Sequence, residues 1–598
     1  MGDVRSHRRE NGVWPWVTVV VMVAGLSACG GGEAADPLTP YRTQTVNWSA
    51  CDENILGSEE GARRFVRALG SRLQCAEVQA PKDWSQPELG DVSVAVTRLA
   101  AADLAQRRGA ILYNPGGPGV DGRDTWLGVV GAFRLSNAAS VQGAQQLKLL
   151  ASYDMVGFSP RGTGGSTRSY CTITEPNRPV DSSPQGTSDA NLANANLNAQ
   201  SLAQACLRNP LTPYIHTDAT ARDMDLIRSL LGEDKLNYVG YSYGTWLGSW
   251  YASLFPGHVG RMVLDSSSDF SRPMVQSLIA KPRARQRIQD EVWLPYAVRH
   301  ADTFGLGTNA REISQMLMGL PPDLQRVLGT TLSDASYSAA LADEALEWMV
   351  AAQGLGEVLK VTGPADANAV QAQLSAHTFV PLHAERNQRA RARAKVLYRS
   401  AYLAEAESES TPFSPVQTDG AFWSIRCNDS RSPTDPAAWM DLVREQAIMG
   451  PFYYGVVQMN PCLYWGGPRV THPTVDALQK LDILMVQSEY DGATPTPDAD
   501  SYFAQLPMAR RIYIPGEYQH AVFPYQDDCV DVHVVAYLLG ESPTQRQTDC
   551  RAKPLAQDAV VAGMQARSAS EPTYNDPEEA ARWIAQFKRS LVPPAGMH

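Results

Sequence analysis

The stretch LNYVGYSYGTWLGSWYASLF, residues 236–255, decides the fold. Its first part, Leu236–Val239, is apolar and β-prone and predicts a strand. Its last part, Thr245–Phe255, predicts a helix. Between them Ser242 stands in Gly240-Tyr241-Ser242-Tyr243-Gly244. Small residues on both sides let the chain bend sharply enough to push the serine hydroxyl out over the sheet edge. The stretch therefore predicts a strand, a strained turn with a nucleophilic serine, and a helix.

A serine flanked by glycines is weak evidence alone, so its partners matter. In α/β-hydrolases an acid follows the serine after a late strand, and a histidine follows the last strand. Of the ten histidines, His520 is the one in a loop directly after the final predicted strand, Arg511–Ile514. We therefore expect His520 to be the base that takes the proton from Ser242.

Two carboxylates compete for the role of the acid that orients the histidine. Asp491 follows the predicted strand Ile483–Gln487 and a turn. Asp265 closes another predicted strand, Arg261–Leu264. We favour Asp491, and we expect Asp265 to hold loop backbone near the hinge of the insertion that follows.

The oxyanion hole needs two backbone N–H groups aimed at one point. One is expected from Tyr243, the residue after the nucleophile. The other is expected from Asn114–Gly119 (NPGGPG), which follows the short apolar run Gly109–Asn114. Such a density of glycine and proline predicts a loop at a strand end. Gly117, or its neighbour Gly116, is the candidate donor, and a plain tight turn is the alternative.

The remaining pattern predicts an α/β-hydrolase fold with a mostly parallel central sheet. Further strands are expected at Val92–Leu99, as an antiparallel edge strand, and at Leu149–Val156. A helix is expected at Thr217–Leu231, capped by Thr217 or Asp218. The predicted core comprises residues 46–269 and 471–598. Between late core strands, residues 270–470 are mostly helical in pattern and are expected to form a large helical cap.

The first residues are not expected to belong to the fold. Arg5, Arg8 and Arg9 precede the apolar run Val13–Leu26, which is too short for an ordinary membrane span and is typical of a secretion signal. Leu26-Ser27-Ala28-Cys29 resembles a bacterial lipobox. We expect residues 1–28 to be a signal peptide, Cys29 to carry lipid, and residues 29–45 to be a tether. An ordinary cleaved signal with an incidental cysteine is the alternative.

Composition restricts the partners and the covalent framework. The net charge of −11 argues against nucleic acid as a partner. Apart from Cys29, eight cysteines remain, and an even number in an exported chain predicts disulfides. Sequence alone does not fix their pairing, but nearest-neighbour pairs give loops that cross-link well. These pairs are Cys51–Cys75, Cys171–Cys206, Cys427–Cys462 and Cys529–Cys550. No metal-ligand spacing is present, and no cofactor is expected.

Five motifs in order resemble one family. They are NPGGPG, YDMVGFSPRGTGGS, GYSYGTWLGSWYASLFPGHVGRMVLD, SEYDGATP and GEYQH. Together they resemble the tripeptidyl aminopeptidase-like and proline iminopeptidase-like serine hydrolases. The resemblance covers about Cys51–Asp265 and Leu481–Cys550, and Cys427-Asn428-Asp429 with Cys462 and Trp465 resembles the closing part of the insertion.

The resemblance implies an exported exopeptidase that removes short peptides or single residues from free N-termini. Together with the lipobox-like stretch, this predicts a lipid-anchored enzyme of the bacterial cell envelope. The resemblance also implies Ser242 as nucleophile, Asp491 as acid, His520 as base, and Gly117 with Tyr243 as oxyanion donors. Such enzymes hold the substrate ammonium with carboxylates, for which Asp269, Glu291 and Glu344 are candidates.

The chain departs from the family pattern at three places. Asp121 stands where a small serine is usual, Ser266-Ser267 replaces a glycine, and Ala521 follows His520 where glycine is common. Asp121 could bind an ammonium group or cap the following helix. A carboxylester hydrolase with the same triad is the alternative function, and a non-catalytic binding protein is a third hypothesis.

Overall fold

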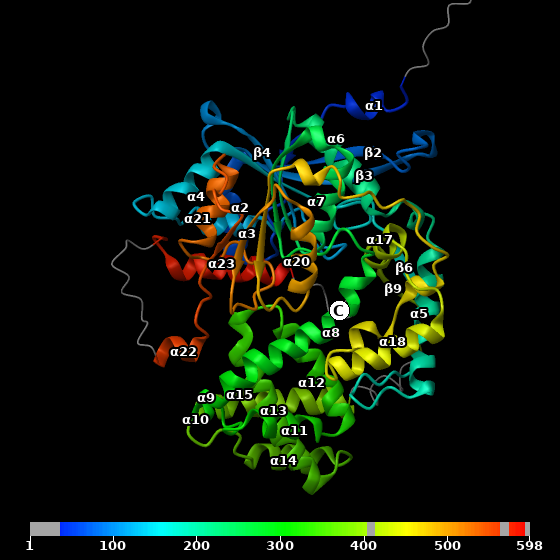
Figure 1. Cartoon of the computed structure of the whole chain (residues 1–598), viewed down its shortest axis with the longest axis vertical. Coiled ribbons are helices and arrows are strands. Elements are labelled where there is room, and N and C mark those ends of the chain that lie inside the picture. Colours follow the sequence, from blue (N-terminus) through cyan, green and yellow to red (C-terminus); the bar gives the residue numbers. More distant parts are fainter. Residues whose placement is uncertain (1–35, 404–412, 562–572, 592–598) are drawn as a thin grey trace, which may run out of the picture.

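The computed structural model describes residues 36–403, 413–561 and 573–591. The expected signal peptide and the lipidation site Cys29 lie outside the described residues, as do residues 29–35 of the expected tether. The rest of that tether is described and contains the short helix α1 (Thr39–Arg42). The described chain has a large sheet at one end and a mainly helical part at the other (Figure 1). Within the described ranges, helices that combine the length and the apolar character needed to cross a membrane are absent.

A ten-stranded sheet forms the centre of the first part, in the order β1-β2-β3-β5-β4-β7-β8-β10-β11-β12. In this order, neighbouring strands from β5 onward pair in parallel, whereas the pairs β1–β2, β2–β3 and β3–β5 are antiparallel. The bounds in sheet order are Ser49–Ala50, Leu73–Pro81, Asp91–Leu99, Tyr153–Phe158, Gly109–Asn114, Leu236–Tyr241, Val259–Asp265, Ile483–Ser488, Arg510–Ile514 and Gln547–Asp549. The predicted mostly parallel sheet is confirmed.

Several local predictions were wrong in detail. The run Val92–Leu99 is β3, which lies inside the sheet between β2 and β5 and is not an edge strand. Residues Leu149–Ser152 end the helix α4 (Val141–Ser152), and β5 starts only at Tyr153. Arg510–Ile514 is not the last strand, because the short β12 adds one more at the edge. Apolar runs that cross a helix–strand junction have no periodicity that marks the boundary.

Helices cover both faces of the sheet, and each face has its own apolar core. One core contains residues of α3 (Leu127–Phe133), α4, α21 (Val530–Leu538) and α23 (Pro577–Ser590). The other contains residues of α6 (Thr217–Leu230), α7 (Tyr243–Leu254) and α20 (Thr496–Gln505). The N-cap of α6 is His216, whose Nδ1 accepts from the amide of Ala219, rather than Thr217 or Asp218.

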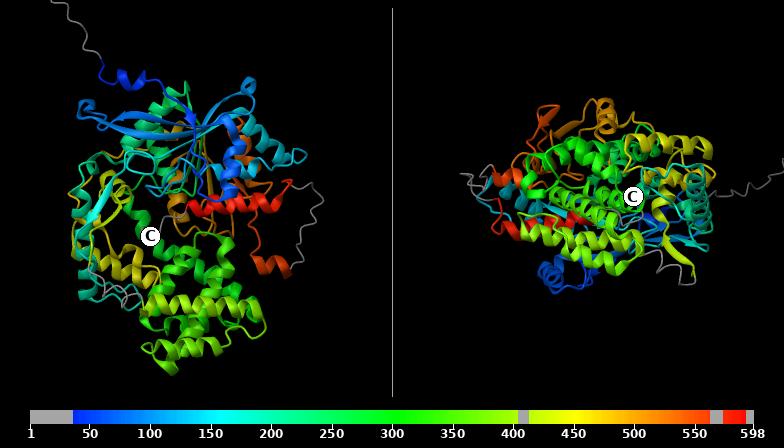
Figure 2. Two further views of the ribbon diagram at one scale, coloured as in Figure 1. Left: turned by 180° about the vertical axis from the view of Figure 1, so that it is seen from behind. Right: turned by 90° about the horizontal axis from the view of Figure 1, so that it is seen from below.

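The chain leaves the sheet after β8 and returns at β10, although these strands are neighbours. The excursion is mostly helical and has its own core. Its helices include α8 (Val275–Ile288), α9 (Leu294–Arg299), α10 (Ala301–Phe304), α11 (Ala310–Met318), α12 (Pro322–Ala335), α13 (Ala342–Thr362), α14 (Ala367–Ala376), α15 (Ala384–Tyr398), α17 (Ala421–Asp429), α18 (Pro436–Met449) and α19 (Gly455–Gln458). Figure 2 shows this part from two further sides. We call it the insertion.

One segment before the elbow also belongs with the insertion. Strand β6 (Tyr170–Ile173) pairs with β9 (Val416–Asp419) of the insertion, in a second, two-stranded sheet. Helix α5 (Asp189–Leu207) contributes Leu192 to a core shared with α8, α18 and α19. This segment was assigned to the core from the sequence. Long-range pairing of this kind leaves no local signal in either stretch.

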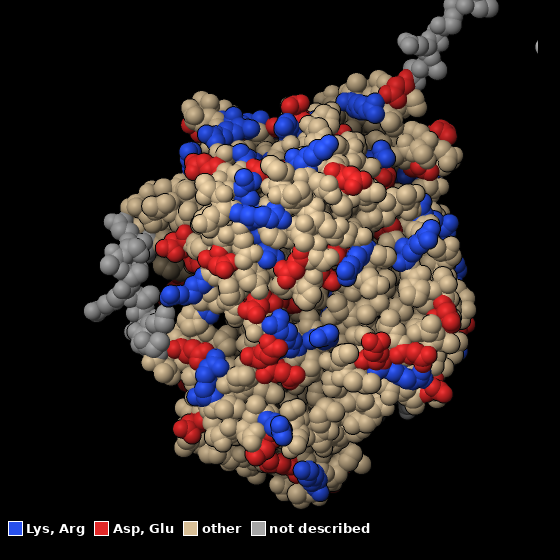
Figure 3. All heavy atoms as spheres, in the orientation of Figure 1, with Lys and Arg blue, Asp and Glu red and all other residues tan. Residues whose placement is uncertain are grey.

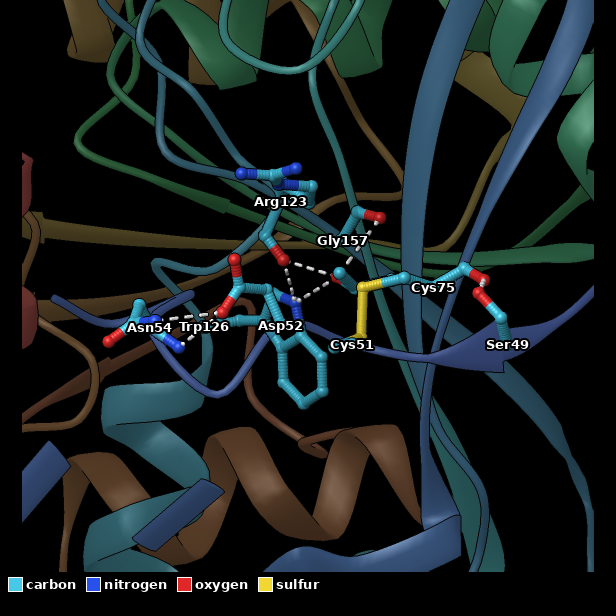
Figure 4. The surroundings of a disulfide bond; sticks show 9 residues. Ser49, Cys51, Asp52, Asn54, Cys75, Arg123, Trp126 and Gly157 are labelled. Carbon is cyan, nitrogen blue, oxygen red and sulfur yellow. Dashed lines mark hydrogen bonds between the residues drawn. A yellow bond between two sulfur atoms is a disulfide. The ribbon is translucent and has the colours of Figure 1, made fainter. Parts of the chain in front are cut away.

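Four disulfides join neighbouring cysteines: Cys51–Cys75, Cys171–Cys206, Cys427–Cys462 and Cys529–Cys550. The first ties the segment before α2 (Glu60–Leu69) to β2 and lies close to Trp126 (Figure 4). The second and third lie in one small core beside Trp465, where the β6–α5 segment meets the insertion.

Acidic and basic side chains are interspersed over the face of the molecule drawn in Figure 3.

Candidate active site

Ser242 occupies the turn between β7 and α7, with φ 56° and ψ −123°. This is a strained conformation for a residue with a side chain. Two backbone bonds hold it, because the Ser242 amide donates to the Asp265 carbonyl (3.0 Å) and the Thr245 amide donates to the Ser242 carbonyl (2.9 Å). The hydroxyl-bearing residue is half-buried. The elbow is therefore fixed from the neighbouring strand β8 as well as by its own helix.

The glycine loop after β4 lies against this elbow. Gly116 and Gly117 have φ of 99° and 105°, a region that favours glycine. A Cβ at Gly116 would clash with the carbonyl of Tyr241 and lie 3.0 Å from the amide nitrogen of Tyr243. The Gly116 amide is already used, since it donates to Asn114 Oδ1 (3.0 Å). The amides of Gly117 and Tyr243 have no acceptor among the described residues, so both are available as donors.

Asp491 and His520 form a buried pair. His520 Nδ1 lies 3.0 Å and 2.9 Å from the two carboxylate oxygens of Asp491. The amides of Ala493 and Thr494 donate to Asp491 Oδ1, both at 2.8 Å, and Thr494 Oγ1 donates to Oδ2 at 2.9 Å. Burial opposes the charge of Asp491, but His520 and these donors hold its pKa below the ordinary value. The carboxylate is thus fixed in place and ionised, and orients the ring through Nδ1.

Asp265 accepts hydrogen bonds from the backbone of the loop that carries His520. Its carboxylate accepts the amides of Val522 (2.8 Å) and Phe523 (2.6 Å), just after His520. Burial raises its pKa to about 6. Asp265 therefore contacts loop backbone, whereas the histidine ring pairs with Asp491.

Two of the departures from the family pattern occur where the backbone has positive φ. Ser266 has φ 60° and Ala521 has φ 54°, values that usually favour glycine. The Ala521 amide donates to Ser266 Oγ (2.8 Å). The serine at 266 thus supplies a side-chain acceptor, which a glycine lacks, to the loop that carries His520.

Lys588 of the C-terminal helix α23 reaches the same loop. Its Nζ donates to the carbonyls of Ala521 and Val522, the latter at 2.6 Å. Burial lowers the pKa of Lys588 to about 8, opposed by the charge of Asp265. The sequence does not predict a function for this helix, because one lysine on an amphipathic helix carries no signal of its own.

The insertion contacts the loops that carry Asp491 and His520. The His520 amide donates to the carbonyl of Tyr337 (2.9 Å), and the two rings meet edge to face at 5.4 Å. Arg285 Nε of α8 donates to the carbonyl of Gly492 (3.2 Å), next to the acid. Both loops that carry the buried pair are therefore in contact with the insertion.

The closing part of the insertion is tied to the elbow helix through Asp429. Its carboxylate accepts from both the amide (2.8 Å) and the hydroxyl of Thr217, and the Thr217 hydroxyl lies 2.6 Å from the hydroxyl of Tyr243. Burial raises the pKa of Asp429 to about 7. The neighbouring Asn428 donates to the carbonyls of Thr212 (2.7 Å) and Ile215 (3.0 Å).

Two family models match the chain. The alpha/beta hydrolase fold matches residues 109–297, and the model described as TAP-like protein matches residues 450–550. The first match contains the elbow and the second contains Asp491 and His520. The chain is a serine hydrolase of the α/β-hydrolase fold, and it is similar to TAP-like proteins.

Three of the curated relatives that match this chain have different names. Tripeptidyl aminopeptidase of Streptomyces coelicolor is 29% identical over 83% of this chain and 89% of that protein. Serine protease Hip1 of Mycobacterium tuberculosis is 26% identical over 90% and 97%. Carboxylesterase B of Mycobacterium tuberculosis is 28% identical over 85% and 90%. The matches span core and insertion alike.

Two cavities adjoin the candidate active site. A narrow one of about 30 Å³ lies against Ser242 and Gly117 and is closed by Lys281 of α8 and Arg426 of α17. A larger one of about 510 Å³ lies on the other side of His520, between the histidine loop, the Tyr337–Leu341 segment and α23. The sequence indicated neither Lys281 nor Arg426, because nothing local distinguishes them from the other cations of helical segments.

The carboxylates named for ammonium binding lie elsewhere. Glu291 pairs with Arg287 (3.0 Å), and Glu344 pairs with Arg393 (3.3 Å), both part-exposed. Asp269 is buried and pairs with Arg272 (3.3 Å). Asp121 accepts from the Ser159 hydroxyl (2.7 Å) and the Arg123 amide (2.9 Å), and so ties two loops together. None of the four lines the cavity against Ser242.

One grouping of metal-ligand type occurs among the described residues, formed by Cys529, His533 and Cys550. Its two cysteines are joined in a disulfide. Since the thiolate is the form that binds metal, this grouping offers one ligand, the imidazole.

Proposed function

We propose that the chain is an exported serine aminopeptidase that works through an acyl-enzyme. Ser242 is the nucleophile, His520 the general base and Asp491 the acid that orients it. The observation that carries this proposal is the buried Asp491–His520 pair, with Nδ1 held at 2.9–3.0 Å, on the same TAP-like scaffold as the elbow. A ring held through Nδ1 presents Nε2 as the proton acceptor.

In the proposed reaction, Ser242 Oγ attacks the scissile carbonyl as His520 Nε2 takes its proton. The amides of Gly117 and Tyr243 stabilise the resulting oxyanion. Protonated His520 then gives the proton to the leaving amine, which departs with the rest of the peptide. Water, deprotonated by the same ring, hydrolyses the ester and regenerates Ser242.

A peptidase is favoured over other acyl hydrolases by two of the relatives, whose names are those of a tripeptidyl aminopeptidase and a serine protease. The third name, carboxylesterase B, makes ester hydrolysis the second candidate. The same groups serve both reactions, so substrate turnover must decide.

The deciding experiment compares three substrate types with the purified chain and with Ser242→Ala. They are peptide anilides with a free N-terminus, the same peptides N-acetylated, and short acyl esters. We expect turnover of the free peptides, loss of most activity on acetylation, and none with the variant. Faster turnover of esters than of any peptide would assign the second function.

We also propose export to the cell envelope with a lipid anchor on Cys29, where the chain meets short peptides. The sequence supports this through the lipobox-like Leu26-Ser27-Ala28-Cys29. Fractionation of cells that express wild-type or Cys29→Ser protein tests it. Membrane association that persists in the variant would contradict the anchor.

A further inference from the structure

The cavity against Ser242 is lined by two cations that have no acidic partner. Lys281 and Arg426 face the same narrow space as Ser242, Gly117 and Thr494. In the described chain, neither side chain forms an ion pair or a hydrogen bond. The guanidinium of Arg426 lies over the rings of Phe422 (5.1 Å) and Trp423 (5.9 Å). Both side chains are half-buried, and charges withdrawn from water are normally paired, so an anion would complete this arrangement.

We call Lys281 and Arg426 the cationic wall of this cavity. Neighbouring arginines add to its positive charge. Arg285, one turn after Lys281 on α8, is buried, and its Nη2 has no hydrogen-bond partner. Arg426 also lines a second small cavity together with Arg431. Burial, together with the charges of Arg285 and Arg426, lowers the pKa of Lys281 well below its ordinary value, and the charge of Asp491 opposes this. The oxygens of Asp491 are occupied by His520 and Thr494, so a carboxylate bound in the cavity would supply the charge that keeps Lys281 protonated.

The size of the cavity restricts what the cations can hold. Its volume of about 30 Å³ leaves room only for a small chemical group. A carboxylate fits such a space, and two cationic donors can neutralise it by charge-assisted hydrogen bonds. An α-ammonium group would be repelled there.

We propose that Lys281 and Arg426 form a subsite for a substrate carboxylate next to the bond that Ser242 attacks. This rests on the proposed peptidase function and specifies its substrate: a peptide with a carboxylate close to the scissile carbonyl. The carboxylate belongs either to an acidic side chain or to the free C-terminus of a short peptide. Lys281 and Arg426 are specificity residues in this proposal and take no part in proton transfer.

The experiment measures kcat/KM for matched peptides and assigns the source of the carboxylate. One pair differs by Glu or Gln beside the scissile bond, and a second pair differs by a free or amidated C-terminus. We expect wild-type protein to prefer the acid of one pair by about 10- to 100-fold, the range for hydrogen bonds to a charged group. The preferred pair identifies the source.

The variants Lys281→Met and Arg426→Met should each remove most of that preference, while Lys281→Arg should retain it. The matched control is Arg283→Met, because Arg283 is an exposed cation on the same helix and lies outside the cavity. It should leave the preference unchanged. A preference that survives both Met variants, or an equal loss in the control, would overturn the proposal.

A second measurement separates this proposal from the function on which it rests. Ser242 is labelled with a neutral fluorophosphonate in the presence of N-acetylglutamate or of the uncharged N-acetylglutaminamide, without any peptide turnover. We expect the acid to protect Ser242 at a concentration about tenfold lower, and Lys281→Met to abolish the difference. Protection without peptidase activity would reject only the peptidase. Peptidase activity with neither protection nor substrate preference would reject the subsite.

Discussion

The two sides of the site differ in how their charged groups are paired. On the side of the sheet, Asp491 and His520 are paired with each other. On the side of the insertion, Lys281 and Arg426 have no carboxylate partner in the described chain. Asp491 accepts three donors besides His520, and the histidine loop is held by Asp265, Ser266 and Lys588. Fixed donors and acceptors suit a reaction that repeats with every substrate. Unpaired cations suit a surface completed by the substrate.

The largest expected effect tests whether the sheet side has one acid or two. Asp491→Asn should lower kcat by about 10⁴-fold with the fold retained, because an amide disfavours the required tautomer of His520. Asp265→Asn should lower kcat far less and should mainly lower the melting temperature. Kinetics and thermal unfolding of both variants check this, and the reverse order would make Asp265 the acid.

The oxyanion loop should be nearly as sensitive. Gly116→Ala places a Cβ against the carbonyl of Tyr241 and on a backbone with positive φ, so it should push the Gly117 amide out of place. We expect kcat to fall by about 10²- to 10³-fold, the cost of one oxyanion donor. Gly257→Ala is a suitable control, since a Cβ there meets nothing within 4 Å. Similar losses in both variants would contradict the assignment.

Two disulfides allow the two sides to be weakened separately. The bridges Cys427–Cys462 and Cys51–Cys75 close loops of 35 and 24 residues, and either should contribute about 3 to 4 kcal/mol to the free energy of unfolding. Double serine variants should both lower stability. Only loss of Cys427–Cys462, which adjoins Arg426, should also raise KM. An equal KM for both variants would show that the cationic wall does not depend on this bridge.

Asp265 makes a pH-dependent contribution to stability. Its pKa is raised from 3.8 to about 6 by burial, so between these values the folded protein binds more protons than the unfolded chain. The contribution of this group to the free energy of unfolding is therefore present below pH 3.8 and is lost as pH rises through 6. Asp265→Asn should reduce this fall, measured by denaturant unfolding at pH 4 and pH 6.5. An unchanged pH dependence would mean that other groups dominate.

The smallest effects are expected at the exposed carboxylates of the insertion. Glu291→Gln and Glu344→Gln each break a part-exposed ion pair with arginine, worth about 0 to 1 kcal/mol. Neither residue lines a described cavity of the site. We expect kcat/KM for N-terminally free peptides to change by less than about twofold. A tenfold loss confined to free N-termini would make that residue an ammonium ligand.

Chain order and local pattern were enough to predict the α/β-hydrolase fold and the pair Asp491 and His520, whose side chains are in contact in the structure. Elbow, acid loop and histidine loop each follow a strand, and the ends of parallel strands meet at one sheet edge, so chain order alone predicts that these residues come together. The disulfide pairs are close in sequence and could be proposed for the same reason.

The residues that surround Ser242, Asp491 and His520 could be identified only from tertiary contacts. Lys588 lies far along the chain from Asp265, the β6–α5 segment packs on the insertion, and Lys281 and Arg426 come from helices separated by most of the insertion. Helical periodicity tells which side of a helix is apolar, but not which other element it packs against. Contacts between distant helices depend on packing of the whole chain, and so the cationic wall that selects the substrate could not be derived from the sequence.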